Sequence, residues 1–160
     1  MLRVRMLSIP LYVTSGISAM DNAQGKKVIL EFLRRHTLAV IATSHADGKP
    51  EAAVIDFSVR DNLEIVFDTF EQTRKFENLS DRGSVALVVG WDKNITVQYE
   101  GDAMKVSASD VQEYQKAHLE SVPVEREFVE NGAVLFKVVP RWIRYSDFTK
   151  DPVEGLELRF

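Results

Sequence analysis

Two adjacent cations, Arg74 and Lys75, follow a strand-like segment at a point where the hydrophobic period of the sequence changes. Apolar and polar side chains alternate over residues 63–68, whereas Phe76 and Leu79 recur at helical spacing. The two cations therefore lie within about two turns of a predicted helix N-terminus. That N-terminus carries roughly half a positive charge and unpaired N–H groups, so the cations repel it unless an anion binds. A phosphate group would satisfy these groups together.

The start of this helix has two candidate caps, Thr69 and Thr73, and Thr69 with Gln72 matches a capping box. A second interpretation of Arg74 and Lys75 stays open beside the phosphate site. The pair is also compatible with an exposed helix face on which the cations contact neighbouring polar residues, namely Glu71, Glu77 or Asn78.

The composition limits the classes of function. A chain of 160 residues fits one domain, and its net charge of −4 gives no basic surface to attract nucleic acid, so a phosphate site would be local. The absence of cysteine excludes disulfides, thiolate metal sites and cysteine nucleophiles, and it agrees with a cytoplasmic location. The three histidines lack the spacing of metal ligands, so no metal site is expected: His36, His45 and His118.

The N-terminal segment, residues 1–20, contains two arginines and a short apolar run that resemble a secretory signal. Pro10 and Gly16 interrupt that run, and no stretch of the chain approaches the roughly 18 apolar residues of a membrane span. We expect residues 1–20 to be a dispensable tail or extra segment, with Met20 as an alternative start. Residues 21–160 are expected to form a single domain with no membrane partner.

The remaining patterns predict a mainly β protein with flanking helices. Asp47-Gly48 marks a hairpin turn, and six strands mostly joined by hairpins indicate a closed antiparallel barrel. The predicted strands cover residues 38–44, 51–60, 63–68, 84–91, 95–106 and 134–147, and the predicted helices cover residues 26–36, 74–79, 109–119 and 125–130.

Four local features refine this prediction. The near-continuous apolar run at 84–91 is typical of a strand that is buried on both faces. Gly101 interrupts its strand and predicts a bulge, and Pro140 predicts a kink in the last strand. Ser109 and Gln112 match a capping box at the start of a helix. The residues after Lys150 form a predicted tail.

The order of these elements resembles the FMN-binding split barrels, the family related to pyridoxamine 5′-phosphate oxidase. The resemblance covers roughly residues 25–147 and implies a six-stranded antiparallel split β-barrel. Its most specific segments are LAVIATSHADGKPEAAVIDF (38–57), FDTFEQTRKFENL (67–79), SVALVVGW (84–91) with VQYEGDAMKV (97–106), and VVPRWIRYSDF (138–148).

The resemblance implies FMN as the cofactor, because the family holds the FMN phosphate with a basic pair that matches Arg74 and Lys75. Thr73 would add a hydroxyl, and Asp68-Thr69 would lie beside the ribityl chain and the phosphate. The strand along the flavin ring would offer main-chain groups of four residues, Ala53, Val54, Ile55 and Asp56.

The resemblance also implies a homodimer with flavin sites at the subunit interface. Thr96 matches a strand position from which a neighbouring subunit reaches the cofactor, and Trp142 lies where the family places groups against the flavin or at the interface. Trp91 and Trp142 are the aromatic candidates for that interface.

Two departures bear on the reaction. Ala53 and Ser58 stand where pyridoxamine 5′-phosphate oxidases have an arginine and a lysine, and their Arg-x-His segment near the C-terminus is missing. We therefore expect an FMN-dependent oxidoreductase that acts on an unidentified small substrate, without the vitamin B6 reaction and without an assigned acid or base. The alternatives are a non-catalytic flavin-binding sensor or carrier module, or the same fold with a deazaflavin or haem.

Overall fold

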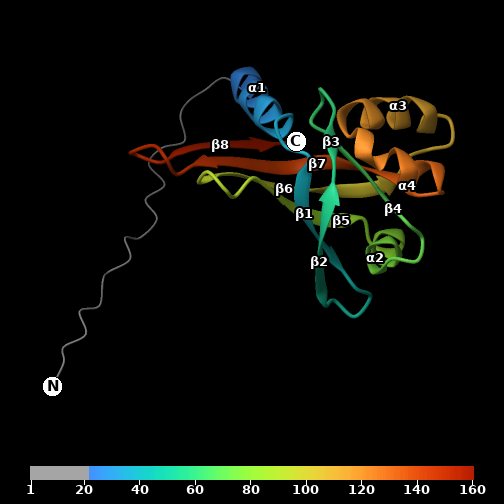
Figure 1. The fold of residues 1–160 in the computed structure, drawn as a ribbon. Helices are drawn as coiled ribbons and strands as arrows, with labels where there is room; N and C mark the ends of the chain where they lie inside the picture. The colour runs from blue at the N-terminus through green and yellow to red at the C-terminus, as the bar shows by residue number, and fades with distance from the viewer. Residues whose placement is uncertain (1–21) are drawn as a thin grey trace.

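The computed structural model describes residues 22–160 (Figure 1). The predicted dispensable segment, residues 1–20, lies outside the described residues. No helix of the described part is long and apolar enough to cross a membrane.

The helices are α1 (Asn22–Leu33), α2 (Arg74–Asp81), α3 (Val111–Ser121), the 3-10 helix η1 (Pro123–Glu125) and α4 (Arg126–Glu130). The strands are β1 (Leu38–Ser44), β2 (Pro50–Asp56), β3 (Ser58–Val59), β4 (Ile65–Thr69), β5 (Ser84–Val89), β6 (Ile95–Lys105), β7 (Val134–Asp147) and β8 (Glu154–Arg159).

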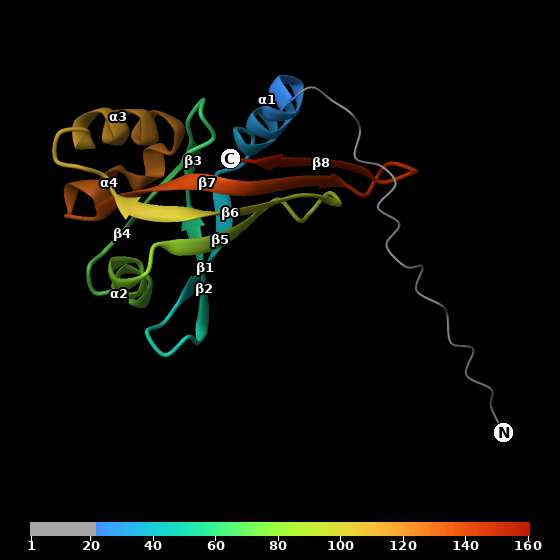
Figure 2. The same ribbon diagram turned by 180° about the vertical axis from the view of Figure 1, so that it is seen from behind.

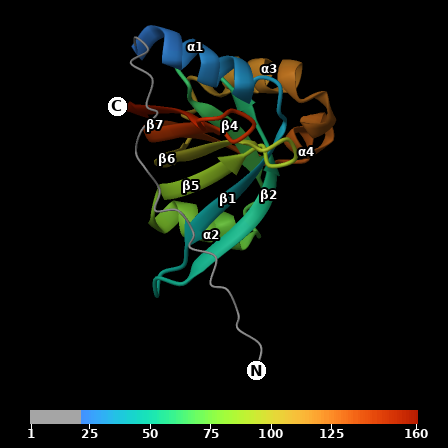
Figure 3. The ribbon, with the colours of Figure 1, turned by 90° about the vertical axis from the view of Figure 1, so that its left-hand side faces the viewer.

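The strands form one antiparallel sheet in the order β2-β1-β5-β6-β7-β4-β3, and β8 also pairs with β7. Figure 3 shows the sheet curling, with α1 above its upper strands and α2 beside its lower ones. The two end strands, β2 and β3, follow each other in the chain with only Phe57 between them. The chain therefore joins the two edges of the curled sheet, as in a split barrel, and the predicted fold class is confirmed.

The predicted number of six strands is too low, because the described residues form eight. The predicted strand 51–60 divides at Phe57, whose buried ring enters the core, so that β2 pairs with β1 and β3 pairs with β4. The predicted C-terminal tail contains β8, whose Leu156 and Leu158 are buried. In the sequence, two alternating leucines among six residues are too short a pattern to identify a strand.

Strand β5 is buried on one face only, so the prediction of burial on both faces is wrong for the single chain. Val85, Leu87 and Val89 point into the core, whereas Ala86 and Val88 are exposed. No described element covers this outer face. A run of small and apolar residues predicts contact on both sides of a strand, but it does not indicate whether the same chain provides that contact.

The predicted bulge at Gly101 is confirmed in the β6–β7 ladder. Glu100 pairs with Trp142, but Gly101 pairs with Pro140, so the register shifts by one residue between them. A Cβ atom at Gly101 would lie 2.4 Å from the Val139 carbonyl oxygen. Only glycine fits this approach of the two backbones.

The helices pack at different parts of the sheet. On the α1 side, the Phe32 ring contacts the Tyr145 ring of β7 edge to face, with a centroid distance of 5.5 Å. Helices α3 and α4 lie together at the opposite end (Figure 2). Helix α3 begins after Asp110 without a side-chain cap, so the predicted capping box of Ser109 and Gln112 is wrong although the helix is present.

Candidate functional site

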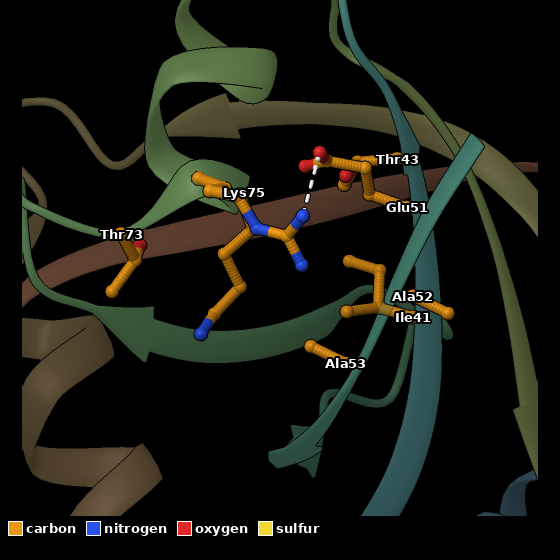
Figure 4. Close-up of a pocket in the computed structure, with 8 residues that line it drawn as sticks. Ile41, Thr43, Glu51, Ala52, Ala53, Thr73 and Lys75 are labelled. Carbon is orange, nitrogen blue, oxygen red and sulfur yellow. Dashed lines mark hydrogen bonds and ion pairs between the residues drawn. The ribbon is translucent and has the colours of Figure 1, made fainter. Parts of the chain in front are cut away.

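A cavity of about 180 Å³ lies between strands β1 and β2 and the N-terminus of α2 (Figure 4). It is open to solvent on one side and combines small side chains of β2 with the polar start of the helix. The residues that line it are Ile41, Thr43, Glu51, Ala52, Ala53, Thr73, Arg74 and Lys75.

Thr73 is the cap of α2, and its Oγ1 accepts a hydrogen bond from the Phe76 backbone N–H at 3.3 Å. Thr69 ends strand β4, with its Oγ1 2.8 Å from Thr73 Oγ1, so the predicted capping box with Gln72 is wrong. The backbone N–H groups of Arg74 and Lys75 have no hydrogen-bond acceptor among the described residues. The positive end of the helix therefore reaches the cavity with free donors.

The Arg74 guanidinium lies over the β2 side of the cavity, where its Nη1 donates to Glu51 Oε1 at 3.0 Å. Asn78 is buried and donates through Nδ2 to Glu51 Oε2 at 3.0 Å and to Thr43 Oγ1 at 2.9 Å. Within residues 22–160, Arg74 thus pairs across the fold with Glu51. Its partner is none of the three residues considered for an exposed helix face.

Lys75 projects from the start of α2 on the side away from Glu51 (Figure 4). Burial lowers its pKa, while the charge of Asp68 opposes that change. Burial raises the pKa of Asp68, and Asp56 raises it further, against the effects of Glu125 and Lys75. Asp68 Oδ2 is buried and has no hydrogen-bond partner among the described residues.

Glu125 is a buried carboxyl group near Asp56 and Asp68 that the sequence does not predict. It lies in η1 with 7% of its surface exposed, and burial together with the charges of Asp68 and Asp56 raises its pKa to about 7. Pro123 signals the start of a helical turn, but nothing local indicates that the turn packs beside strand carboxylates. The contact of Glu125 with these carboxylates depends on how the chain packs η1 against the strands.

The cavity brings together four of the predicted site residues, Ala53, Thr73, Arg74 and Lys75. Thr69 contacts Thr73, Asp68 interacts with the charge of Lys75, and Asp56 interacts with Asp68. The remaining four do not line the cavity in the single chain: Ile55 is in the core, Val54 is exposed, Thr96 is opposite Ser146 in the β6–β7 ladder, and Trp142 lies between Glu100 and Arg159.

A family model described as Pyridoxamine 5′-phosphate oxidase matches residues 26–147 of this sequence. The chain belongs to the pyridoxamine 5′-phosphate oxidase family. No curated protein sequence matches it.

Solved structures related to the pyridoxamine 5′-phosphate oxidase family share its fold. An FMN-binding, pyridoxamine 5′-phosphate oxidase-related protein from Nostoc punctiforme has a TM-score of 0.61 and 13% identity, over 89% of this chain and 98% of that one. A putative pyridoxamine 5′-phosphate oxidase from Listeria innocua has a TM-score of 0.60 and 18% identity, over 75% and 96%. A haem-binding protein from Mycobacterium smegmatis has a TM-score of 0.71 and 12% identity over 82% of this chain, which spans 57% of that longer protein.

The two departures from the pyridoxamine 5′-phosphate oxidase pattern have structural consequences. Ala53 leaves open space where an arginine would enter the cavity. Ser58 is buried, and its Oγ lies 2.8 Å from His118 Nδ1 on α3, outside the cavity lining. Neither residue offers a cation to a substrate phosphate.

Proposed function

We propose that this protein binds FMN in the cavity between β2 and α2 and acts as an oxidoreductase on a small substrate. The observation that carries the proposal is the Thr73-capped start of α2, where Arg74, Lys75 and free backbone N–H groups border one cavity. This donor set suits a phosphate group, and the FMN-binding protein from Nostoc punctiforme with the same fold supports FMN as the ligand. Ala52 and Ala53 are small enough to leave room for a ring beside β2.

The bound flavin would supply the electron chemistry, and the protein would supply binding and orientation. Arg74 offers a planar fork and Lys75 a point charge to the phosphate. Asp68 and Thr69 would border the ribityl chain, and the main chain of residues 53–56 would border the ring. Glu125 does not line the cavity, so no side chain is assigned as acid or base.

We further propose a homodimer, because the outer face of β2, β1 and β5 carries apolar side chains in register. Val54 and Val88 lie on either side of Val40 and are 61% and 38% exposed. In the next row, Ala52 and Ala86 flank Ala42. An exposed apolar face of this kind fits a subunit interface. The neighbouring subunit would bring Thr96 and Trp142 to the flavin.

FMN is favoured over haem by the cavity lining. A haem-binding protein shares the fold, but none of the residues that line this cavity is a histidine, the usual axial ligand. A deazaflavin coenzyme and a non-catalytic flavin carrier remain the alternatives within the same fold.

The absorption spectrum of the protein as purified tests the cofactor. Bound FMN gives bands at about 370 and 450 nm, whereas a deazaflavin or haem gives a different spectrum. Oxidation of NADH or NADPH by the flavin-loaded protein then separates an oxidoreductase from a carrier. A protein that neither retains nor binds added FMN contradicts the proposal.

A further inference from the structure

One contact in the cavity opposes a bound phosphate. Glu51 accepts a hydrogen bond from Arg74 with one carboxylate oxygen at 3.0 Å (Figure 4). Its other carboxylate oxygen accepts one from Asn78, also at 3.0 Å. The guanidinium that would meet the phosphate is therefore already held by an anion of the same chain.

In the ion pair of Glu51 and Arg74, the Glu51 side chain is the one whose position is fixed by other contacts. Asn78 is 2% exposed and anchors its amide on Thr43 at 2.9 Å, so both N–H groups of that amide hold a defined position. The Glu51 side chain is 19% exposed, whereas that of Arg74 is 77% exposed. The long, solvated arginine has the freedom to change partner, and the carboxylate does not.

We propose that Glu51 competes with the FMN phosphate for Arg74 and thereby sets how strongly the protein prefers FMN over riboflavin. This inference rests on the proposed FMN site. A phosphate dianion that enters the cavity must draw Arg74 away from Glu51 or share it with a carboxylate of like charge. In both cases, part of the attraction between Arg74 and the phosphate is lost. FMN should therefore bind less tightly and exchange with FMN in solution.

Replacement of the carboxylate tests the competition. In Glu51→Gln the side chain keeps its length and loses its charge, so FMN should bind about tenfold more tightly while riboflavin, which has no phosphate, is unchanged. Glu51→Ala should change the FMN affinity in the same direction and serves if the glutamine variant does not fold. Glu77→Gln is the matched control, because it removes an exposed carboxylate from the first turn of the same helix.

A second experiment tests the role of Arg74 by repeating the Glu51 substitution in the Arg74→Ala variant. If Glu51 acts through Arg74, adding Glu51→Gln to Arg74→Ala should change the FMN affinity by less than about twofold. Flavin titration gives each affinity, and thermal unfolding confirms that each variant folds. A wild-type protein that binds neither flavin overturns the proposed function and this inference together. Wild-type FMN binding that Glu51→Gln leaves unchanged or weakens, or a tenfold gain that persists without Arg74, overturns the inference alone.

Discussion

Arg74 and Lys75 are adjacent in sequence and both line the cavity, but they interact with different residues. Arg74 donates to Glu51 on β2 (Figure 4), whereas Lys75 interacts electrostatically with Asp68. A phosphate at the start of α2 would lie between them and contact both. Variants of these two cations can therefore test phosphate binding independently of binding to the flavin ring.

The double variant Arg74→Ala/Lys75→Ala should weaken FMN binding by about two to four powers of ten, since each charge-assisted contact contributes roughly 1.5–3 kcal/mol. Riboflavin binding should change little because riboflavin lacks the phosphate. Folding should also change little, because the Arg74–Glu51 ion pair that is lost is exposed on the arginine side, and the removal of two cations near the helix N-terminus offsets its loss. Titration of both flavins by fluorescence measures the effect.

Lys26→Ala/Lys27→Ala is the matched control for this variant, because it removes two adjacent cations from α1. It should leave both affinities unchanged. Equal losses of FMN and riboflavin in Arg74→Ala/Lys75→Ala would contradict a phosphate site.

His118 makes the stability of the fold depend on pH. Its ring is fully buried, and burial lowers its pKa to about 4 from 6.5. The unfolded chain therefore binds this proton more readily, so the stabilisation is complete above pH 6.5 and is lost as the pH falls toward 4. The loss over that window is on the order of 3 kcal/mol of unfolding free energy.

His118→Asn should lower the stability at pH 7, because the replacement packs less well. It should also flatten the profile of unfolding free energy between pH 6.5 and 4 relative to wild type. Denaturant unfolding at several pH values measures both effects, and His45→Asn is the control at a surface position. An unchanged slope in His118→Asn would exclude this histidine as the cause.

At the scale of elements, local patterns predicted most of the strands and helices. The change of period between residues 63–68 and Phe76 located α2, and Gly101 located the bulge. The Glu51 contact was not predictable, because it joins Arg74 to a residue 23 positions away through the curl of the sheet. The burial of Glu125 was missed for the same reason, since it depends on packing between distant elements.

Gly101→Ala should destabilise the protein by about 2–4 kcal/mol of unfolding free energy. The new Cβ would lie 2.4 Å from the Val139 carbonyl oxygen, so two backbones must separate. In the control Gly155→Ala, the nearest atom is the Tyr145 carbonyl oxygen at 3.9 Å, and the change should stay within about 0.5 kcal/mol. Similar losses in both variants would show that the bulge does not require glycine.

At the scale of the whole molecule, the proposed homodimer depends on the outer face of β5. Val88→Asp places a charge on the proposed interface and should convert a dimer into a folded monomer, as measured by sedimentation at micromolar concentration. The core residues of β5 face the other way and are unaffected. Val153→Asp, a change at another exposed valine, should leave the dimer intact. A wild-type protein that sediments as a monomer with FMN bound would contradict the interface.

Strand β7 pairs with β6 along most of its length, but its partner on the other edge changes. Residues 134–138 pair with β4, which leads to α2, and residues 142–147 pair with β8, while Pro140 and the register shift lie between the two halves. Opening of one half breaks hydrogen bonds that the other half does not share. The backbone amides of the two halves should therefore exchange with deuterium at separate rates, and flavin bound at α2 should slow exchange in residues 134–138 more than in residues 142–147.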